Sequence, residues 1–307
     1  MSISPKVSVL LAAYNSGETL EEAIQSVLGQ SYPNLQLIVC DDGTREFDQK
    51  GLEEFIQERF PNAQAKIIHQ RENVGTVRNL NTGLREADGE WIMLMAADDC
   101  FTTERAVEHL MALVCESGRK WAIARTALCN EDLAPQGKSV PVCDVATGIA
   151  AGNAGAVYLE LCLGCCFPAA GSVYQAELLR QVGGFDETYR LTEDWPLFLK
   201  LVRQGVMPAV SREDLVLHRF GGVSRRNAGK NYPYQHDLIT VLRQEVAPHI
   251  GLLGQKDQET VRRLIHEKEL GFAFRFSCHT MWEKLLWAAR HPLFILRKLL
   301  RRREQIW

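Results

Sequence analysis

The first hundred residues restrict the fold most, because short apolar runs alternate there with segments of helical periodicity. Three apolar runs are typical of buried strands and occupy residues 7–12, 35–40 and 91–95, and a further strand is predicted at residues 65–69. Helical segments lie between them, and the connections are short. Alternation of this kind predicts a parallel sheet with helices on both faces. We therefore predict an α/β fold with a mostly parallel central sheet flanked by helices.

Carboxylates follow two of these strands at the point where each strand ends. Asp41 and Asp42 follow the second strand, and Asp98 and Asp99 follow the fourth. Ligands of open α/β sheets collect at the carboxyl ends of the strands, so we expect these acids to face one crevice. Adjacent carboxylates repel each other unless a cation lies between them, and Mg²⁺ takes oxygen ligands. For an isolated Asp-Asp pair, a polar loop without a ligand is the simpler interpretation.

Composition gives no reason to propose nucleic acid as a partner. The chain has 307 residues and a formal net charge of −3, with a pI near 6.3. Positive charge is concentrated in residues 284–303, where seven Lys or Arg occur without any Asp or Glu. The sequence lacks the charged start and apolar core of a signal peptide, and no uncharged apolar run reaches the roughly 18 residues of a membrane span. We therefore expect a cytoplasmic protein.

The nine cysteines also suit a reducing cytosol. One C-x-x-C occurs, at residues 162–165, but the second one that a structural zinc site pairs with it is absent. Cys162, Cys165 and Cys166 cluster in an apolar run, and we interpret them as small buried hydrophobes.

Five segments in a consistent order carry a resemblance to a known family. They read VSVLLAAYN, AIQSVLGQSYPN, LIVCDDGT, NVGTVRNLNTGL and ADGEWIMLMAADD. Together they resemble the nucleotide-sugar-binding half of the family 2 glycosyltransferases, which have the Rossmann-like GT-A fold. The resemblance implies that Tyr14 and Asp42 hold the nucleotide base, with Asp41 a weaker candidate and Ala12 in the same site. The motifs of dinucleotide-binding and P-loop proteins are absent.

The resemblance also implies a divalent metal. In that family a D-x-D motif binds the ribose and the metal ion on the sugar-nucleotide diphosphate. Here Ala96 replaces the first acid of the usual D-x-D-D pattern and leaves Asp98 and Asp99. We expect Mg²⁺ or Mn²⁺ at these two acids, with Asp98 also contacting the nucleotide sugar. Arg78, on the predicted helix 76–87, is a candidate partner for phosphate oxygens, and a solvated surface arginine is the equal alternative.

A second informative stretch, VGGFDETYRLTEDWPLFLKLVRQG, extends from residue 182 to residue 205. Thr192 is a predicted N-cap for the apolar helix that follows. The stretch resembles the acceptor-side half of the same family, which implies that Asp194 is the general base. The alternative is an acidic helix start, and we favour that alternative for Glu193.

In the segment LVLHRFGGVS, His218 and Arg219 are further candidates. The family often has a flexible loop here that closes over the donor. The resemblance implies contacts of His218 and Arg219 with the metal or the diphosphate, and a structural histidine is the alternative.

We expect a catalytic domain in residues 1–225, with a nucleotide-sugar-binding half in residues 1–100 and an acceptor half in residues 101–225. Residues 129–156 are interpreted as loops. Residues 226–307 form a predicted helical extension, which the resemblance does not cover. Its last predicted helix, 292–303, has apolar and basic residues that suit a membrane interface, with a core-packed helix as the alternative.

Taken together, the sequence predicts an inverting, metal-dependent glycosyltransferase. The donor would be a UDP- or dTDP-linked sugar, and the acceptor a glycan or lipid-linked saccharide in cell-surface polysaccharide synthesis. Peripheral contact with the inner face of a membrane is expected through the basic C-terminal helix. One alternative is a sugar-nucleotide-binding protein without transfer activity, with Ala96 as a first sign of decay. Another is a nucleotidyltransferase, although the turn after the first strand lacks the expected basic, glycine-rich phosphate loop.

Overall fold

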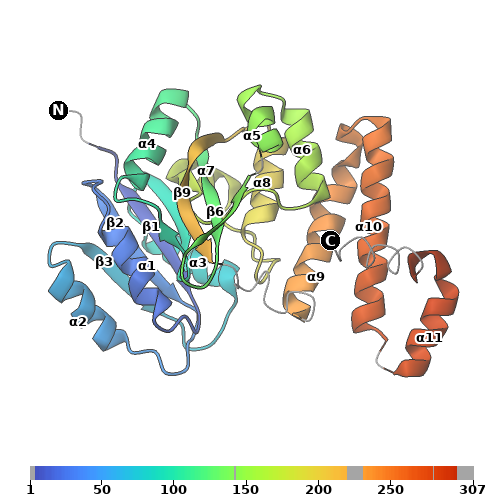
Figure 1. Cartoon of the computed structure of the whole chain (residues 1–307), viewed down its shortest axis with the longest axis horizontal. Helices are drawn as coiled ribbons and strands as arrows, with labels where there is room; N and C mark the ends of the chain where they lie inside the picture. The colour runs from blue at the N-terminus through green and yellow to red at the C-terminus, as the bar shows by residue number, and fades with distance from the viewer. Residues whose placement is uncertain (1–3, 142, 220–230, 279, 296–307) are drawn as a thin grey trace. The chain divides into compact units, whose positions relative to one another are not determined.

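The computed structural model describes residues 4–141, 143–219, 231–278 and 280–295. The chain divides into two compact units, residues 1–227 and 228–307 (Figure 1). The predicted domain boundary between residues 225 and 226 lies outside the described residues. The predicted division into domains therefore stays a prediction.

The first unit is built around a nine-stranded sheet with the strand order β3-β2-β1-β4-β8-β6-β9-β5, and β7 pairs with β6. The strands are β1 (Val7–Ala13), β2 (Leu35–Asp41), β3 (Gln64–His69), β4 (Trp91–Ala96), β5 (Cys100–Phe101), β6 (Trp121–Cys129), β7 (Pro135–Val140), β8 (Val173–Gln175) and β9 (Ala209–Arg219). The long ladders β1–β2, β1–β4, β2–β3 and β6–β9 are parallel, whereas β8 and β5 join through short antiparallel ladders. The predicted α/β fold is confirmed, and the sheet becomes mixed beyond β4.

Helices cover both faces of the sheet, because alternate residues of a strand point to opposite sides (Figure 1). Val9 and Leu11 of β1 belong to a core that also includes buried residues of α1 and α4. On the other face, a Cβ added to Gly83 of α3 would lie 3.4 Å from Leu10. The helices of this unit are α1 (Thr19–Leu28), α2 (Gln49–Arg59), α3 (Thr76–Glu86), α4 (Ala106–Ser117), α5 (Cys143–Ala150), α6 (Ala154–Leu163), α7 (Ala176–Val182) and α8 (Asp194–Arg203).

The prediction of loops for residues 129–156 is wrong, because this stretch contains β7, α5 and the start of α6. Helix α6 buries Val157 and Leu161, and it packs against α8. Trp195 of α8 donates a hydrogen bond from Nε1 to the carbonyl of Leu161 over 2.8 Å. Packing against a neighbouring helix therefore selects a helix where the local composition favours turns.

The second unit is helical. It contains α9 (Tyr232–Val241), the π-helix η1 (Leu242–Val246), the 3-10 helix η2 (Ala247–Leu252), α10 (Gln255–Phe276) and α11 (Met281–Arg290). The ring of Tyr232 on α9 lies 5.7 Å from that of Phe272 on α10. The predicted helical extension is confirmed for the described residues, and residues 296–303 of its last predicted helix lie outside them. Within the described ranges, no helix has the length and apolar content to cross a membrane.

Candidate functional site

The carboxyl ends of three parallel strands lie level with one another. Ala12 of β1 pairs with Ala96 of β4, and Ala13 of β1 pairs with Asp41 of β2. Neighbouring strands are about 4.8 Å apart, so the ends of β2 and β4 are separated by roughly 10 Å across β1. The two acidic pairs therefore flank the residue that follows β1. That residue is Tyr14, whose side chain is 48% exposed.

Asp41 and Asp42 are buried, and their carboxylates hold the loops beside β2. Asp41 accepts hydrogen bonds from the N–H and Oγ1 of Thr44 at 2.9 and 2.5 Å, and it lies 2.8 Å from Nδ1 of His69. Asp42 accepts from two backbone N–H groups of the loop before α3, at 2.7 to 3.2 Å. Burial raises the pKa of the Asp42 carboxyl, and these amide donors partly oppose that shift. Both acids shape the loops at this edge, and their contact with a nucleotide base stays a prediction.

The acids after β4 differ from each other, because Asp99 is buried and held by β9 whereas Asp98 is partly exposed. Nδ1 of His218 lies 2.9 and 3.0 Å from the two Asp99 oxygens, and the backbone N–H of Arg219 donates to Asp99 at 3.2 Å. Burial raises the pKa of the Asp98 carboxyl, and the negative charge of Asp99 raises it further. A cation bound beside the pair would relieve this repulsion.

His218 and Arg219 lie in β9 rather than in the expected flexible loop, because β9 pairs with β6 as far as Arg219. The Arg219 side chain forms a close ion pair with Glu22 of α1 and donates from Nε to the carbonyl of Glu131 at 2.8 Å. Its guanidinium therefore links β9 to α1 and to the segment after β6. Contacts of His218 and Arg219 with the donor stay predictions.

The acids after β4 fit a hard divalent cation that is shared with a ligand. Among the residues that the structure describes, no three His, Cys, Asp or Glu side chains converge as a complete metal site. Mg²⁺ is commonly held by one or two carboxylates together with substrate phosphates, rather than by an all-protein cage. Asp98 and Asp99 supply the carboxylate part of such a site, so the residues present suit a metal that arrives with a diphosphate.

Asp194 is the first residue of α8, and two donors hold its carboxylate. The N–H of Trp195 donates to Oδ1 at 2.6 Å, and the thiol of Cys165 lies 3.5 Å from Oδ2. Burial raises the pKa of the Asp194 carboxyl, and both donors oppose the shift. Glu193, rather than the predicted Thr192, occupies the N-cap position of α8.

The interpretation of the cysteine cluster as buried hydrophobes holds for Cys162 but not for Cys165. Cys162 is fully buried, whereas solvent reaches Cys165. The protein around Cys165 nevertheless raises the pKa of its thiol, as does the nearby charge of Asp194. The thiol therefore keeps its proton at neutral pH and can donate it in a hydrogen bond.

The segment that precedes β8 brings Asp194 toward the edge that carries the other acids. β8 runs antiparallel to β4, with Val173 opposite Met93, and the N–H of Gly171 donates to the carbonyl of Leu94 at 2.8 Å. The chain before Gly171 therefore extends past the carboxyl end of β4, where Asp98 and Asp99 lie. Cys165 belongs to that chain and contacts Asp194.

Asn81 of α3 binds the GGFDE turn through the main-chain N–H and carbonyl of Phe185. Its Oδ1 accepts from the N–H of Phe185 at 3.0 Å, and its Nδ2 donates to the carbonyl of Phe185 at 2.8 Å and to Glu187 at 3.1 Å. Asn81 is 8% exposed. A buried side-chain amide of α3 thus holds the main chain of the GGFDE turn.

A second contact of α3 lies at its N-terminus. The carbonyl of Arg190 accepts from the N–H of Val77 at 3.2 Å, and its guanidinium donates to the carbonyl and side chain of Asn73 at 2.8 and 2.6 Å. Gly75 permits this approach, because its φ is +94° and an added Cβ would lie 2.5 Å from the Arg190 side chain. Sequence patterns alone do not identify these residues. The available signal is asparagine at position 81, which shares the apolar side of the predicted helix with Val77 and Leu80.

Arg78 and Ala12 border the same edge. Arg78 is exposed near the start of α3, and its Nε lies 3.5 Å from Glu187. A surface pair of this kind is weak, so Arg78 is available to a phosphate group. Ala12 is partly exposed, and its carbonyl accepts from the N–H of Ala97 at 2.9 Å.

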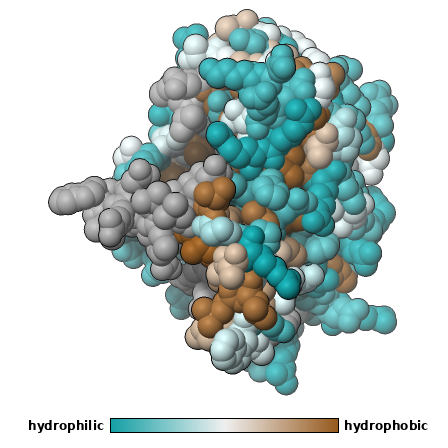
Figure 2. All heavy atoms as spheres, turned by 90° about the vertical axis from the view of Figure 1, so that its right-hand side faces the viewer, coloured by the Kyte–Doolittle hydropathy of each residue, from teal (hydrophilic) through white to brown (hydrophobic). Residues whose placement is uncertain are grey.

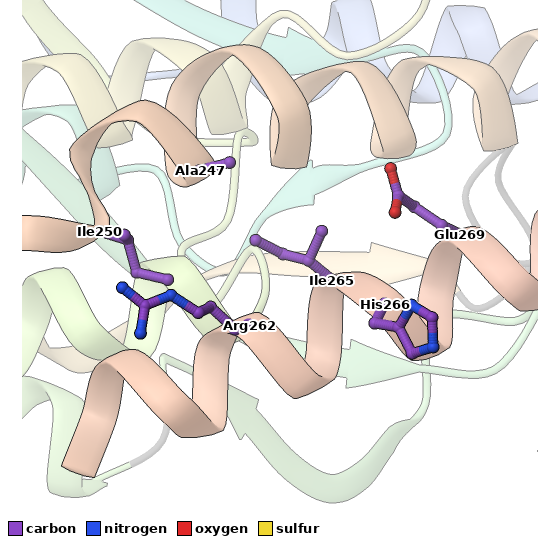
Figure 3. A pocket seen from close by; sticks show the side chains of 6 residues that line it. All are labelled: Ala247, Ile250, Arg262, Ile265, His266 and Glu269. Atoms are coloured by element: carbon purple, nitrogen blue, oxygen red, sulfur yellow. The ribbon is translucent and has the colours of Figure 1, made fainter. Parts of the chain in front are cut away.

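A shallow pocket lies within the second unit and contains none of the predicted site residues (Figure 3). It is lined by Ala247, Ile250, Arg262, Ile265, His266 and Glu269. Its charged groups already have protein partners, since Arg262 donates to Gln258 at 3.0 Å and Glu269 accepts from Arg243 at 2.7 Å. We assign no function to this pocket.

Comparison with known proteins gives a family match within the first half of the chain. Residues 8–149 match the model of glycosyl transferase family 2. An uncharacterized glycosyltransferase of Haemophilus influenzae is 36% identical over 99 residues, which are 32% of this chain and 30% of that protein. The poly-beta-1,6-N-acetyl-D-glucosamine synthase of Staphylococcus epidermidis is 34% identical over 92 residues, or 30% of this chain and 21% of that protein. The chain therefore spans less than a third of the length of either relative.

Among solved structures, the chain resembles the mannosyltransferase PcManGT from Pyrobaculum calidifontis in complex with GDP-Man and Mn²⁺. The TM-score is 0.60 at 15% sequence identity, and the match covers 96% of this chain and 81% of the other. A likeness at this identity concerns the fold, and it confirms the predicted GT-A architecture.

Proposed function

Because residues 8–149 form a family 2 glycosyltransferase domain, we propose that this protein transfers a sugar from a nucleoside-diphosphate donor to a saccharide acceptor with inversion. The observation that carries the proposal is the pair of acidic sites described above. Asp98 and Asp99 follow β4, and Asp194 is held by two hydrogen-bond donors beside the chain that extends past that strand.

The donor would occupy the edge formed by the ends of β1, β2 and β4. Tyr14 offers an exposed aromatic surface for the base, between the two acidic pairs. Ala12, Asp41 and Asp42 would complete the base end of the site. The donor that we expect is UDP- or dTDP-linked, whereas the PcManGT complex contains GDP-Man. A thermal-shift panel of UDP-, dTDP- and GDP-linked sugars, with and without Mn²⁺, distinguishes these donors through the stabilisation of the folded state.

Asp98 and Asp99 would hold Mg²⁺ or Mn²⁺, and the Mn²⁺ of the PcManGT complex supports this choice. The metal would supply positive charge to the leaving diphosphate. Arg78, which is exposed at the start of α3, would add a second cationic contact to the phosphate oxygens. His218 orients Asp99 and would lie within reach of the same groups.

Asp194 would act as the general base. An acceptor hydroxyl is a poor nucleophile until a base removes its proton during attack. The hydrogen bonds from Trp195 and Cys165 fix the carboxylate, and burial raises the pKa of this carboxyl, which strengthens it as a proton acceptor. Attack from the side opposite the departing nucleoside diphosphate inverts the anomeric centre.

The substitution Asp194→Asn tests this role, with Glu193→Gln as a control that removes the adjacent charge. We expect Asp194→Asn to abolish transfer while donor binding, measured by calorimetry, is retained. Glu193→Gln should keep most of the activity. Near wild-type turnover of the Asp194→Asn protein would exclude this residue as the base.

The acceptor would be a glycan or a lipid-linked saccharide in cell-surface polysaccharide synthesis, and the name of the Staphylococcus relative, a poly-beta-1,6-N-acetyl-D-glucosamine synthase, supports polysaccharide synthesis in general. Peripheral contact with the cytoplasmic face of a membrane, through the basic segment 284–303, would give access to a lipid-linked acceptor. The alternative is a nucleotide-sugar-binding protein without activity. Donor hydrolysis in the presence of Mn²⁺ and without acceptor would argue against that alternative.

A further inference from the structure

Helix α11 presents a continuous row of large apolar side chains to solvent. Their exposed fractions are high: Met281 72%, Trp282 76%, Leu285 54%, Leu286 58% and, just beyond the helix, Leu293 70%. The spacing of positions 281, 282, 285 and 286 places them along one face of α11, and Leu293 lies beyond the C-cap residue His291. Apolar side chains gather in the lower part of the face shown in Figure 2, on the side where Figure 1 shows α11. We refer to these five residues as the outer face of α11.

The outer face is not the surface that anchors α11 within the second unit. Trp287, on the other side of the helix, packs against Phe274 of α10 at 5.0 Å and against Phe294 at 5.3 Å between ring centroids. A capping box between Thr280 and Glu283 fixes the start of α11. The helix is therefore formed and packed through one side while a second apolar side stays in water.

The charge around the outer face indicates what covers it. In the sequence, residues 284–303 contain seven Lys or Arg and no Asp or Glu; Lys284 and Arg290 lie on α11, together with Glu283, and the other five lie outside the described residues. Two copies of the chain that met through this face would each contribute a basic segment to the same interface. An anionic surface would instead be attracted to that segment.

We propose that the outer face of α11 inserts into the interfacial layer of a membrane that contains anionic lipids. The helix has ten residues, too few to cross a bilayer, so it would lie in the plane of the interface. Trp282 would sit at the headgroup level, with the leucines and the methionine directed toward the acyl chains. Basic residues beside them would contact phosphate groups. This face is the surface that would make the peripheral membrane contact suggested above. Membrane binding itself does not depend on the proposed function; only its use, which is to bring the enzyme to a lipid-linked acceptor, rests on that function.

Vesicle co-sedimentation of the full chain, without donor or acceptor, tests the proposal independently of catalysis. Vesicles of phosphatidylcholine with about one third phosphatidylglycerol would be compared with vesicles of phosphatidylcholine alone. We expect binding to the anionic vesicles and its loss at about 1 M salt. The double substitution Trp282→Ser and Leu286→Ser should lower the partition coefficient roughly tenfold or more, because two exposed apolar side chains no longer enter the bilayer.

The matched control is Leu252→Ser, which removes another exposed leucine, 64% exposed, from η2 of the same unit. This substitution should leave vesicle binding unchanged. Circular dichroism and gel filtration of each variant would report helix content and oligomeric state. Equal vesicle binding by the double variant and the wild type would overturn the proposal. So would a wild-type dimer that dissociates in the double variant, because a second copy would then occupy the outer face.

Discussion

The substitution Asn81→Ala should destabilise the first unit far more than the loss of one ordinary asparagine contact. It removes the acceptor for the N–H of Phe185 and the donor to the Phe185 carbonyl. Both hydrogen bonds are buried, and Asn81 itself is only 8% exposed to solvent. A buried backbone group without a partner costs roughly 1–3 kcal/mol. Two such groups give an expected loss of about 2–6 kcal/mol in the free energy of unfolding, with the lower end applying if water enters the space.

Asn153→Ala provides the matched control, because it makes the same chemical change at a helix N-cap. Asn153 accepts a single exposed hydrogen bond from the N–H of Ala156 at 3.1 Å. Loss of such a cap costs about 1 kcal/mol. Urea denaturation of both variants gives the two free energies, and amide hydrogen exchange at Phe185 reports the local contact directly. If Asn81→Ala costs no more than Asn153→Ala, or leaves exchange at Phe185 unchanged, the reasoning about this amide is refuted.

The remaining predictions concern the acidic sites. Asp98→Asn should weaken Mn²⁺-dependent donor binding in calorimetry without lowering the melting temperature, whereas Asp99→Asn should lower that temperature because His218 and Arg219 of β9 keep only one of their two acceptor oxygens. Equal effects of the two substitutions on stability would contradict the distinction. The acid limb of the pH–rate profile should lie above the ordinary pKa of an aspartate, because burial raises the pKa of Asp194 and the base must be ionised. A hydrogen bond from the thiol favours the ionised carboxylate, so Cys165→Ala should move this limb to higher pH while Cys165→Ser leaves it near its original position. A limb that stays in place in Cys165→Ala would exclude that contact.

Local sequence patterns predict the first half of the fold well. β1, β2 and β4 are largely apolar runs, so their burial is visible in a few neighbouring residues, whereas β3 contains polar residues and is mostly exposed. The acids that end β2 and β4 fall on one edge for a similar reason, because parallel strands in register place their carboxyl ends level. The resemblance to family 2 glycosyltransferases, which rests on the same residues, is confirmed.

Features that depend on distant parts of the chain are not predicted. The loop expected around His218 is a strand, because β6 lies beside it and supplies hydrogen-bond partners. Asn81 resembles an ordinary polar helix residue until Phe185, 104 positions later, packs against it. From local composition, Cys165 is predicted to be buried like its apolar neighbours. Its contact with Asp194, which lies on α8, depends on a residue 29 positions away and is not visible in the local sequence.

The link between Asn81 and the GGFDE turn has a consequence for how such enzymes diversify. Asn81 binds the main-chain N–H and carbonyl of residue 185, which every residue type except proline offers, and it also donates to the side chain of Glu187. The side chain at position 185 can therefore change while the turn keeps its main-chain attachment to α3. Recombination between relatives would preserve the hydrogen bonds between α3 and this turn whenever the asparagine and the backbone conformation of the turn are retained.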